Sequence, residues 1–205
     1  AAAAGAEAGN ADLIVLNAKV YTVDTRMPRA QAFAVKNSRF IAVGTNDEIK
    51  GLAGKDTTTY DAKGMTIVPG FVDCHVHYPQ LPVIGSYGAK LLDWLERYTF
   101  PAEAAFADER VARRVARDYL DENLRQGITT AAVFCTVHPA SVDALMAEAA
   151  RRSLRLVAGK VLMDRNAPRA LRDTAKRGYD ESKALIARWH GRGRLGYAIT
   201  PRFAV

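Results

Sequence analysis

From Met65 onward the chain alternates short apolar stretches with longer amphipathic ones, and this alternation restricts the fold more than any other feature of the sequence. The apolar stretches have the length and the flanking signals of strands. We expect four strands, over Thr66–Phe71, Thr129–Cys135, Leu154–Met163 and Leu195–Thr200. Alternating strands and helices predict parallel strands joined by right-handed crossovers, which is an α/β architecture.

The amphipathic stretches have the spacing and the end signals of helices. Asp108 is suited to cap a long helix, and Gly127 suits the position that follows it. The apolar residues of this helix recur at helical spacing, at Val111, Val115, Tyr119 and Leu120. Further helical segments are expected over Leu91–Tyr98, Ser141–Arg152, Pro168–Lys176 and Tyr179–Trp189.

Two histidines, His75 and His77, stand near the end of the strand-like stretch Ile67–Gln80. Side chains of a strand alternate between its faces, so both imidazoles are expected on one side, with Cys74 and Val76 on the other. Zinc prefers nitrogen ligands at about 2.0–2.1 Å, and two imidazoles at this spacing can converge on one ion. In a β/α barrel the C-terminal end of a strand carries the chemistry. The alternative is a pair of ordinary histidines near a strand end.

The residues around this pair resemble those of a known family. The run from Val68 to His77, with its Pro-Gly and its His-x-His, is similar to the first barrel strand of the amidohydrolase superfamily, whose His-x-His supplies two metal ligands. The similarity narrows to the guanine deaminases of that superfamily and runs from about Val68 to the last residue. The stretches that match in order are Tyr78–Gln80, Leu91–Pro101, Thr136–Pro139, Gly159–Pro168 and Tyr197–Phe203.

The resemblance implies a TIM-type β/α barrel, a homodimer and a hydrolase that uses one Zn2+ per site to deaminate guanine to xanthine and ammonia. His75 and His77 would be metal ligands, and Gln80, Arg202 and Phe203 would bind the purine. An amide and a guanidinium can contact the edge of a purine, and a phenyl ring can cover its face. The alternative for these three residues is a solvent-exposed position without a ligand.

The family's later metal ligands and its proton-transferring glutamate have no counterpart in this sequence. Besides the first pair, the chain has only His138 and His190, and no His-x-x-Glu occurs. A β/α barrel needs eight strands and about 250 residues. We therefore interpret residues 65–205 as the N-terminal half of a barrel, an incomplete barrel of about four βα units without a catalytic residue of its own. The chain alone is expected to be inactive, and a non-catalytic role stays open.

Residues 11–64 differ in character and predict a small all-β domain ahead of the barrel. Its β-prone runs, separated by turn residues, are Leu13–Leu16, Lys19–Val23, Gln31–Val35, Arg39–Val43 and Thr57–Tyr60. The segments Asn17–Asp24 and Ile41–Gly44 resemble amidohydrolase family 3, which keeps open a metal-dependent enzyme acting on an amide or ester, or a hybrid chain. Residues 1–10, which are rich in Ala and lack Met, are interpreted as a leader or a cloning remnant.

Composition limits the partners. The net charge of +7 permits an acidic partner, but the basic residues are spread over helical segments, and the run Arg188–Arg194 is explained by the C-terminus of a helix. We therefore expect a small purine as partner and no nucleic acid. Cys74 and Cys135 lie in separate apolar stretches, which indicates reduced core thiols of a cytoplasmic protein. No apolar run approaches the roughly 18 residues of a membrane span, so we expect no membrane association.

Overall fold

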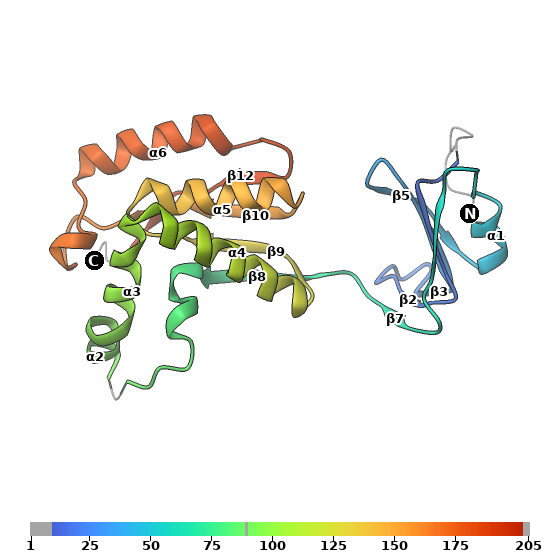
Figure 1. Cartoon of the computed structure of the whole chain (residues 1–205), viewed down its shortest axis with the longest axis horizontal. Helices are drawn as coiled ribbons and strands as arrows, with labels where there is room; N and C mark the ends of the chain where they lie inside the picture. The colour runs from blue at the N-terminus through green and yellow to red at the C-terminus, as the bar shows by residue number, and fades with distance from the viewer. Residues whose placement is uncertain (1–9, 89, 203–205) are drawn as a thin grey trace. The chain divides into compact units, whose positions relative to one another are not determined.

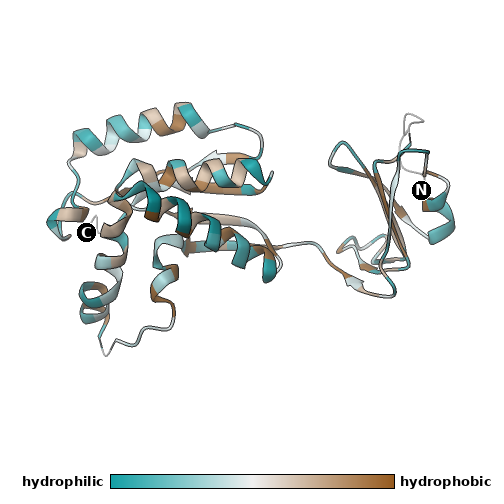
Figure 2. Ribbon diagram, viewed as in Figure 1, coloured by the Kyte–Doolittle hydropathy of each residue, from teal (hydrophilic) through white to brown (hydrophobic). Residues whose placement is uncertain are grey.

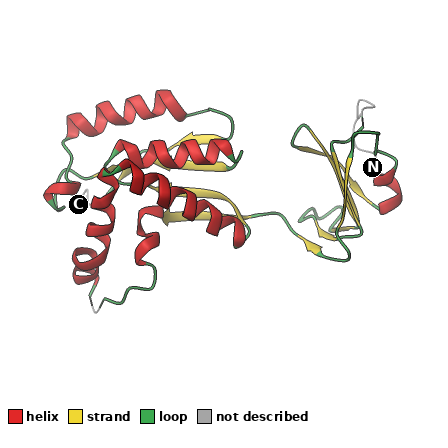
Figure 3. Cartoon of the chain, viewed as in Figure 1, coloured by secondary structure: helices red, strands yellow, loops and turns green. Residues whose placement is uncertain are grey.

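The computed structural model describes residues 10–88 and 90–202. The chain divides into two compact units, one ending at Pro69 and the other beginning at Gly70. The first consists mainly of strands and the second of helices and strands in alternation (Figure 3). The interpretation of residues 1–10 as a leader falls almost wholly outside the described residues.

The first unit contains a four-stranded sheet of order β5-β4-β1-β6 and a three-stranded sheet of order β3-β2-β7. Its strands are β1 Leu13–Leu16, β2 Lys19–Tyr21, β3 Arg29–Ala30, β4 Ala32–Lys36, β5 Arg39–Gly44, β6 Thr58–Asp61 and β7 Thr66–Ile67. Asn37 and Ser38, both with positive φ, make the two-residue turn between β4 and β5. Positive φ at both central residues is typical of hairpin turns that match the twist of the strands.

The expectation of an all-β domain is wrong in one respect, because this unit also contains the helix α1, Asn46–Lys50. Thr45 and Glu48 form a capping box at its start, in which each side chain accepts a hydrogen bond from the backbone of the other residue. Ile49 is buried and packs against Ile14 and other residues of the strands. The capping-box residues were therefore visible in the sequence, but a helix of five residues is too short to show helical periodicity.

The predicted strand over Thr66–Phe71 is replaced by two strands in different units. β7 pairs with β2 inside the first unit, whereas β8, Phe71–His77, pairs with a strand of the second. Pro69 lies in the break between them, where its missing N–H and fixed φ suit an interruption of strand pairing. The division after Pro69 therefore differs from the predicted one between residues 64 and 65.

The second unit is built on a parallel sheet of order β12-β10-β9-β8. Each strand of this sheet pairs with the strand of the next βα unit along the chain. Besides β8, its strands are β9 Ile128–Phe134, β10 Arg155–Gly159 and β12 Leu195–Tyr197, with short extensions β11 Val161–Leu162 and β13 Thr200–Pro201 that pair with each other. The predicted α/β class with parallel strands is confirmed. The incomplete barrel stays a prediction.

Three helices cover one face of this sheet: α4 Glu109–Arg125, α5 Pro139–Arg151 and α6 Ala175–Trp189. They lie side by side over the strands in Figure 1, and their apolar residues share one cluster with those of β9, β10 and β12. The side of α4 that faces the viewer in Figure 2 is mostly hydrophilic, as expected for the solvent side of an amphipathic helix. Asp108 caps α4 as predicted, with its side chain accepting from Arg110 N, and Gly127 has the positive φ expected after the helix.

Helical structure before α4 is longer than predicted, and helical structure before α6 is shorter. Residues 91–107 form a nearly continuous run of short helices, α2 Leu91–Trp94, η2 Leu95–Thr99, α3 Phe100–Ala104 and η3 Ala105–Ala107. The predicted helix Pro168–Lys176 is reduced to the single turn η4, Arg169–Leu171. η1, Tyr78–Val83, follows β8 directly.

Cys135 is buried, as predicted, and burial raises the pKa of its thiol. Cys74 is exposed, so the prediction of two core thiols is wrong for this residue. The register of β8 against β9 is irregular between Asp73 and Val76, which removes Cys74 from regular pairing. No helix in residues 10–88 and 90–202 has the length and apolar character needed to cross a bilayer.

Lys160 interrupts the predicted strand Leu154–Met163, separating β10 from β11. It is fully buried and lies on the helix side of the sheet, where its Nζ donates to Val137 O at 2.6 Å and to the Asp173 carboxylate. Glu181 of α6 lies 3.1 Å from the same ammonium. The cluster supplies the charge partners that a buried lysine needs.

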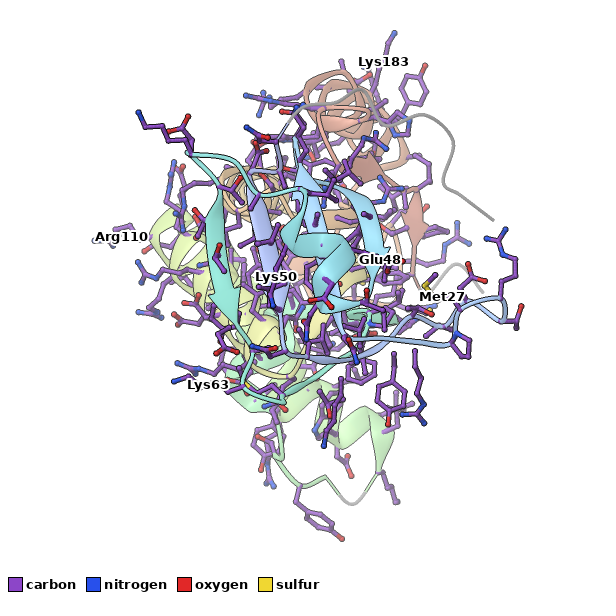
Figure 4. The ribbon with its side chains drawn as sticks, turned by 90° about the vertical axis from the view of Figure 1, so that its right-hand side faces the viewer. Met27, Glu48, Lys50, Lys63, Arg110 and Lys183 are labelled. Atoms are coloured by element: carbon purple, nitrogen blue, oxygen red, sulfur yellow. The ribbon has the colours of Figure 1, made fainter. Side chains whose placement is uncertain are left out.

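Replacing Lys160 with Met should lower the free energy of unfolding by about 3–5 kcal/mol, because two carboxylates would lose their buried partner. Urea denaturation followed by circular dichroism measures this change. Lys183→Met is the matched control, since Lys183 extends from the exposed side of α6 (Figure 4) and should change stability by less than about 0.5 kcal/mol. Equal stability of the two variants would contradict the role given to Lys160.

Candidate functional site

The C-terminal end of β8 carries His75 and His77 on one side of the strand. Their ring centroids lie 5.4 Å apart, and both rings contact Phe134, at 5.0 and 4.7 Å. Phe134 is the β9 residue opposite His77. Val76, between the histidines, packs instead against the helix-covered core. His75 and His77 thus lie on one side of the strand, as predicted, with Val76 on the other. The exposed Cys74, in contrast, falls in the irregular part of the register.

The position of this strand end is fixed by Tyr78 rather than by the histidines. Its side chain is fully buried between Phe106 and Tyr119, and its hydroxyl donates to Ser141 O at 2.7 Å. Tyr78 is also the first residue of η1, and Pro79 follows it in the first turn. The sequence predicted no more for Tyr78 than a role in shaping the turn after the strand, because a tyrosine in this place gives no signal of such burial.

The environment of His77 favours a neutral imidazole. Burial, and then the positive charge of Arg202 and of His75, lower the pKa of His77 to about 4. Its Nδ1 is buried and has no hydrogen-bond partner among the described residues. A neutral imidazole is the form that binds a metal, so His77 needs no deprotonation near pH 7.

Two neighbouring imidazoles fit zinc in the type of donor that they offer. In the part of the chain that the structure describes, however, no group of three or more His, Cys, Asp or Glu side chains is arranged to hold a metal. Asp73, the acidic residue nearest in sequence, accepts a hydrogen bond from His75 N. The described residues therefore bring together the two imidazoles as nitrogen donors, without a third donor of these types beside them.

Gln80 and Arg202 are brought together by a residue that sequence analysis missed. Glu103 of α3 is fully buried, and its Oε1 accepts from Gln80 Nε2 at 3.0 Å and from Arg202 Nη1 at 2.8 Å. Its Oε2 also accepts from Arg202 Nη1, at 2.8 Å. A buried carboxylate is costly unless paired, and here both predicted purine-binding side chains satisfy it. Phe203, the third predicted purine-binding residue, lies outside the described residues.

Two cavities adjoin these side chains. His75, His77 and Gln80 line a cavity of about 440 Å3 beside β8. Arg202 lines a different cavity, of about 390 Å3, beside the N-terminal turn of α6. Glu103 contacts one residue from each cavity, so the two imidazoles, the Gln80 amide and the Arg202 guanidinium form one continuous set.

His138 lies apart from this set. It is the residue before α5, its side chain is half-buried, and its pKa is lowered by burial and by the charges of Lys160 and Arg177. Its backbone carbonyl accepts from Ser141 N at 3.0 Å, which fits a structural role at the start of α5.

The geometry can now be set beside known proteins. The sequence profile of the amidohydrolase family matches residues 66–205, more than half of the chain and all of the parallel sheet. The chain belongs to the amidohydrolase family.

Among curated relatives, the chain is 56% identical over 144 residues to the guanine deaminase of Escherichia coli strain K12, covering 70% of this chain and 33% of that enzyme. It is 46% identical over 178 residues to a probable guanine deaminase of Deinococcus radiodurans, covering 85% of this chain and 40% of the relative. The second match is longer than residues 66–205, so it extends into the first unit. This favours a resemblance to guanine deaminases along both units.

A solved structure of E. coli guanine deaminase superposes with a TM-score of 0.85 at 42% identity, covering 93% of this chain and 47% of that one. The predicted resemblance to guanine deaminases is thus confirmed in sequence and fold. The chain spans only about a third to two fifths of the length of these two curated relatives.

If His75 and His77 hold zinc, the chain should bind it loosely, because catalytic zinc usually has three protein ligands. We expect most of the metal to be lost on dialysis, and His75→Ala or His77→Ala to weaken zinc binding by at least about tenfold. Competition with a chromophoric chelator measures both effects. His190→Asn is the control, since His190 is exposed and accepts a hydrogen bond from Tyr197 N. Stoichiometric zinc after dialysis, or unchanged binding by the alanine variants, would contradict this assignment.

Proposed function

We propose that this chain provides the metal-binding and purine-binding side of a guanine deaminase, a zinc-dependent hydrolase that converts guanine to xanthine and ammonia. The observation that carries the proposal is the grouping of His75 and His77 with the Gln80–Glu103–Arg202 hydrogen bonds. The confirmed resemblance to guanine deaminases supports the same substrate.

His75 and His77 would hold the metal through neutral imidazoles. When bound by these residues, zinc would make hydroxide available near neutral pH and would polarise the substrate. Phe134 stacks on His77 and limits the orientations of that ring. Membership of the amidohydrolase family supports a metal cofactor, and zinc is the ion that we propose from the donor type.

Gln80 and Arg202 would hold the purine in its ring plane, and Phe203 would cover its face. A guanidinium only donates hydrogen bonds, so Arg202 suits a carbonyl oxygen or an unprotonated ring nitrogen. Gln80 Oε1 accepts, so it suits a ring N–H. Together these groups match a small oxopurine. A homodimer and a cytoplasmic location stay predictions.

Deamination also needs a group that transfers protons, and we assign this role to no residue of the chain. We therefore expect the 205-residue chain, supplied with zinc, to release little or no ammonia from guanine. An enzyme of the family 3 type, acting on an amide or ester, is the less favoured function, because Gln80 and Arg202 suit a flat heterocycle.

A chimera tests the proposal most sharply. Residues 66–205 of this chain would replace the matching part of the E. coli guanine deaminase, and ammonia release from guanine would be measured with zinc present. We expect the chimera to deaminate guanine and its His75→Ala and His77→Ala variants to fall to background, because the metal would be lost. The His190→Asn variant is the control and should retain activity.

A folded chimera that binds zinc but releases no ammonia from guanine would contradict the proposed substrate. Activity of the chimera on amides or esters, without activity on guanine, would favour the family 3 alternative instead.

A further inference from the structure

Glu103 is a buried charged residue that has no function in the chemistry proposed above. It lies on α3, whose residues Phe100 and Ala104 pack against the apolar cluster formed by Val137, Val161, Met163 and Leu171. α3 is thereby fixed to the C-terminal extension of the sheet. The Glu103 carboxylate is fully buried. Among the described residues, two side chains donate hydrogen bonds to it, Gln80 and Arg202.

This arrangement determines which atom of the Gln80 amide faces which way. An ionised carboxylate only accepts, so the atom 3.0 Å from Glu103 Oε1 is the amide nitrogen of Gln80. Gln80 Oε1 then points away from Glu103, and no described residue donates to it. Without the carboxylate, the amide could turn and present its N–H groups in either direction.

The same carboxylate fixes Arg202. Both of its oxygens accept from Nη1 at 2.8 Å, and the Arg202 side chain is only 11% exposed. The backbone N–H of Arg202 donates to Leu162 O, which joins this residue to the end of β11. The guanidinium is planar, so contact through one nitrogen restricts the direction of the whole group.

We propose that Glu103 is a positioning residue that sets the hydrogen-bond pattern of the purine site. It turns Gln80 into an acceptor and holds Arg202 as the adjacent donor. That pattern fits a purine edge on which an N–H lies beside a carbonyl oxygen, as in guanine and hypoxanthine. Adenine carries an amino group in place of the carbonyl, so its donor would meet the donors of Arg202. The inference rests on the proposed function and adds the basis of substrate selection to it.

The test compares hypoxanthine with adenine, because the two purines differ only at this edge. Equilibrium dialysis of the full chain with zinc measures the binding of each. The wild type should prefer hypoxanthine, and Glu103→Gln should reduce that preference by about 10- to 100-fold, since its amide can hold Gln80 in either orientation. Glu103→Asp keeps the charge and should restore part of the preference.

The matched control is Glu96→Gln, the same chemical change at an exposed position of the same helical run. It should leave the preference unchanged. Nitrogen-15 NMR of the Gln80 side-chain amide gives a second measurement: its signals should shift in Glu103→Gln and stay in place in Glu96→Gln. The shift reports the loss of the hydrogen bond that Gln80 Nε2 donates to the carboxylate, which a general loss of stability would not produce.

The outcomes separate the two proposals. If the wild type prefers hypoxanthine and Glu103→Gln keeps that preference and the Gln80 signals, the role of Glu103 is overturned and the proposed function stands. If the wild type binds neither hypoxanthine nor guanine, the proposed function fails, and the role of Glu103 in substrate selection fails with it. If Glu103→Gln does not fold, Glu103→Met, which removes the carboxylate but fills its space, takes its place. A hypoxanthine preference equal to the wild type in that variant, together with unshifted Gln80 signals, would overturn the inference.

Discussion

The alternation of side chains along β8 is the constraint on which the rest of the site depends. Val76 is drawn into the core beneath the helices, and this places its neighbours His75 and His77 together on the opposite face. The burial of Tyr78 immediately afterwards prevents the strand from slipping, because a shift of one residue would exchange the two faces. The pairing of the two imidazoles on one side of the strand is therefore a consequence of where the apolar residues lie.

A second constraint is the cost of a buried carboxylate. Glu103 joins residues that are 23 and 99 positions away in sequence, Gln80 and Arg202. Removing one partner of such a buried pair typically costs about 3–5 kcal/mol, so the fold and the proposed purine site are stabilised by the same contacts. Arg202 also lowers the pKa of His77, which ties the proposed substrate-binding group to the proposed metal ligand.

Local patterns in the sequence predicted most of the second unit. The Asp108 cap, Gly127 and the helical spacing of α4 all act within one or two turns, and the structure confirms them. The strand break after Ile67 was missed because β7 and β8 are both apolar, and only pairing with different partners separates them. The burial of Lys160 was missed for a similar reason, since its carboxylate partners follow it on a later segment.

The candidate site was predictable in part. His75, His77, Gln80 and Arg202 were identified through a motif and a resemblance, and the structure groups them as described. Glu103 carried no signal, because a single acidic residue in a helical stretch looks like one of many solvent-facing carboxylates. Its importance follows from tertiary contacts, which spacing along the chain does not encode. The metal and purine roles of these residues stay proposals.

X-ray absorption at the zinc edge of the zinc-loaded chain tests the central claim most directly. The account predicts nitrogen scatterers at about 2.0–2.1 Å with the multiple-scattering pattern of two imidazoles, which is lost in His75→Ala and His77→Ala. The exposed thiol of Cys74, which lies between Asp73 and His75, offers a real alternative ligand. A sulfur scatterer at about 2.3 Å, or a spectrum unchanged by the loss of either imidazole, would contradict the account.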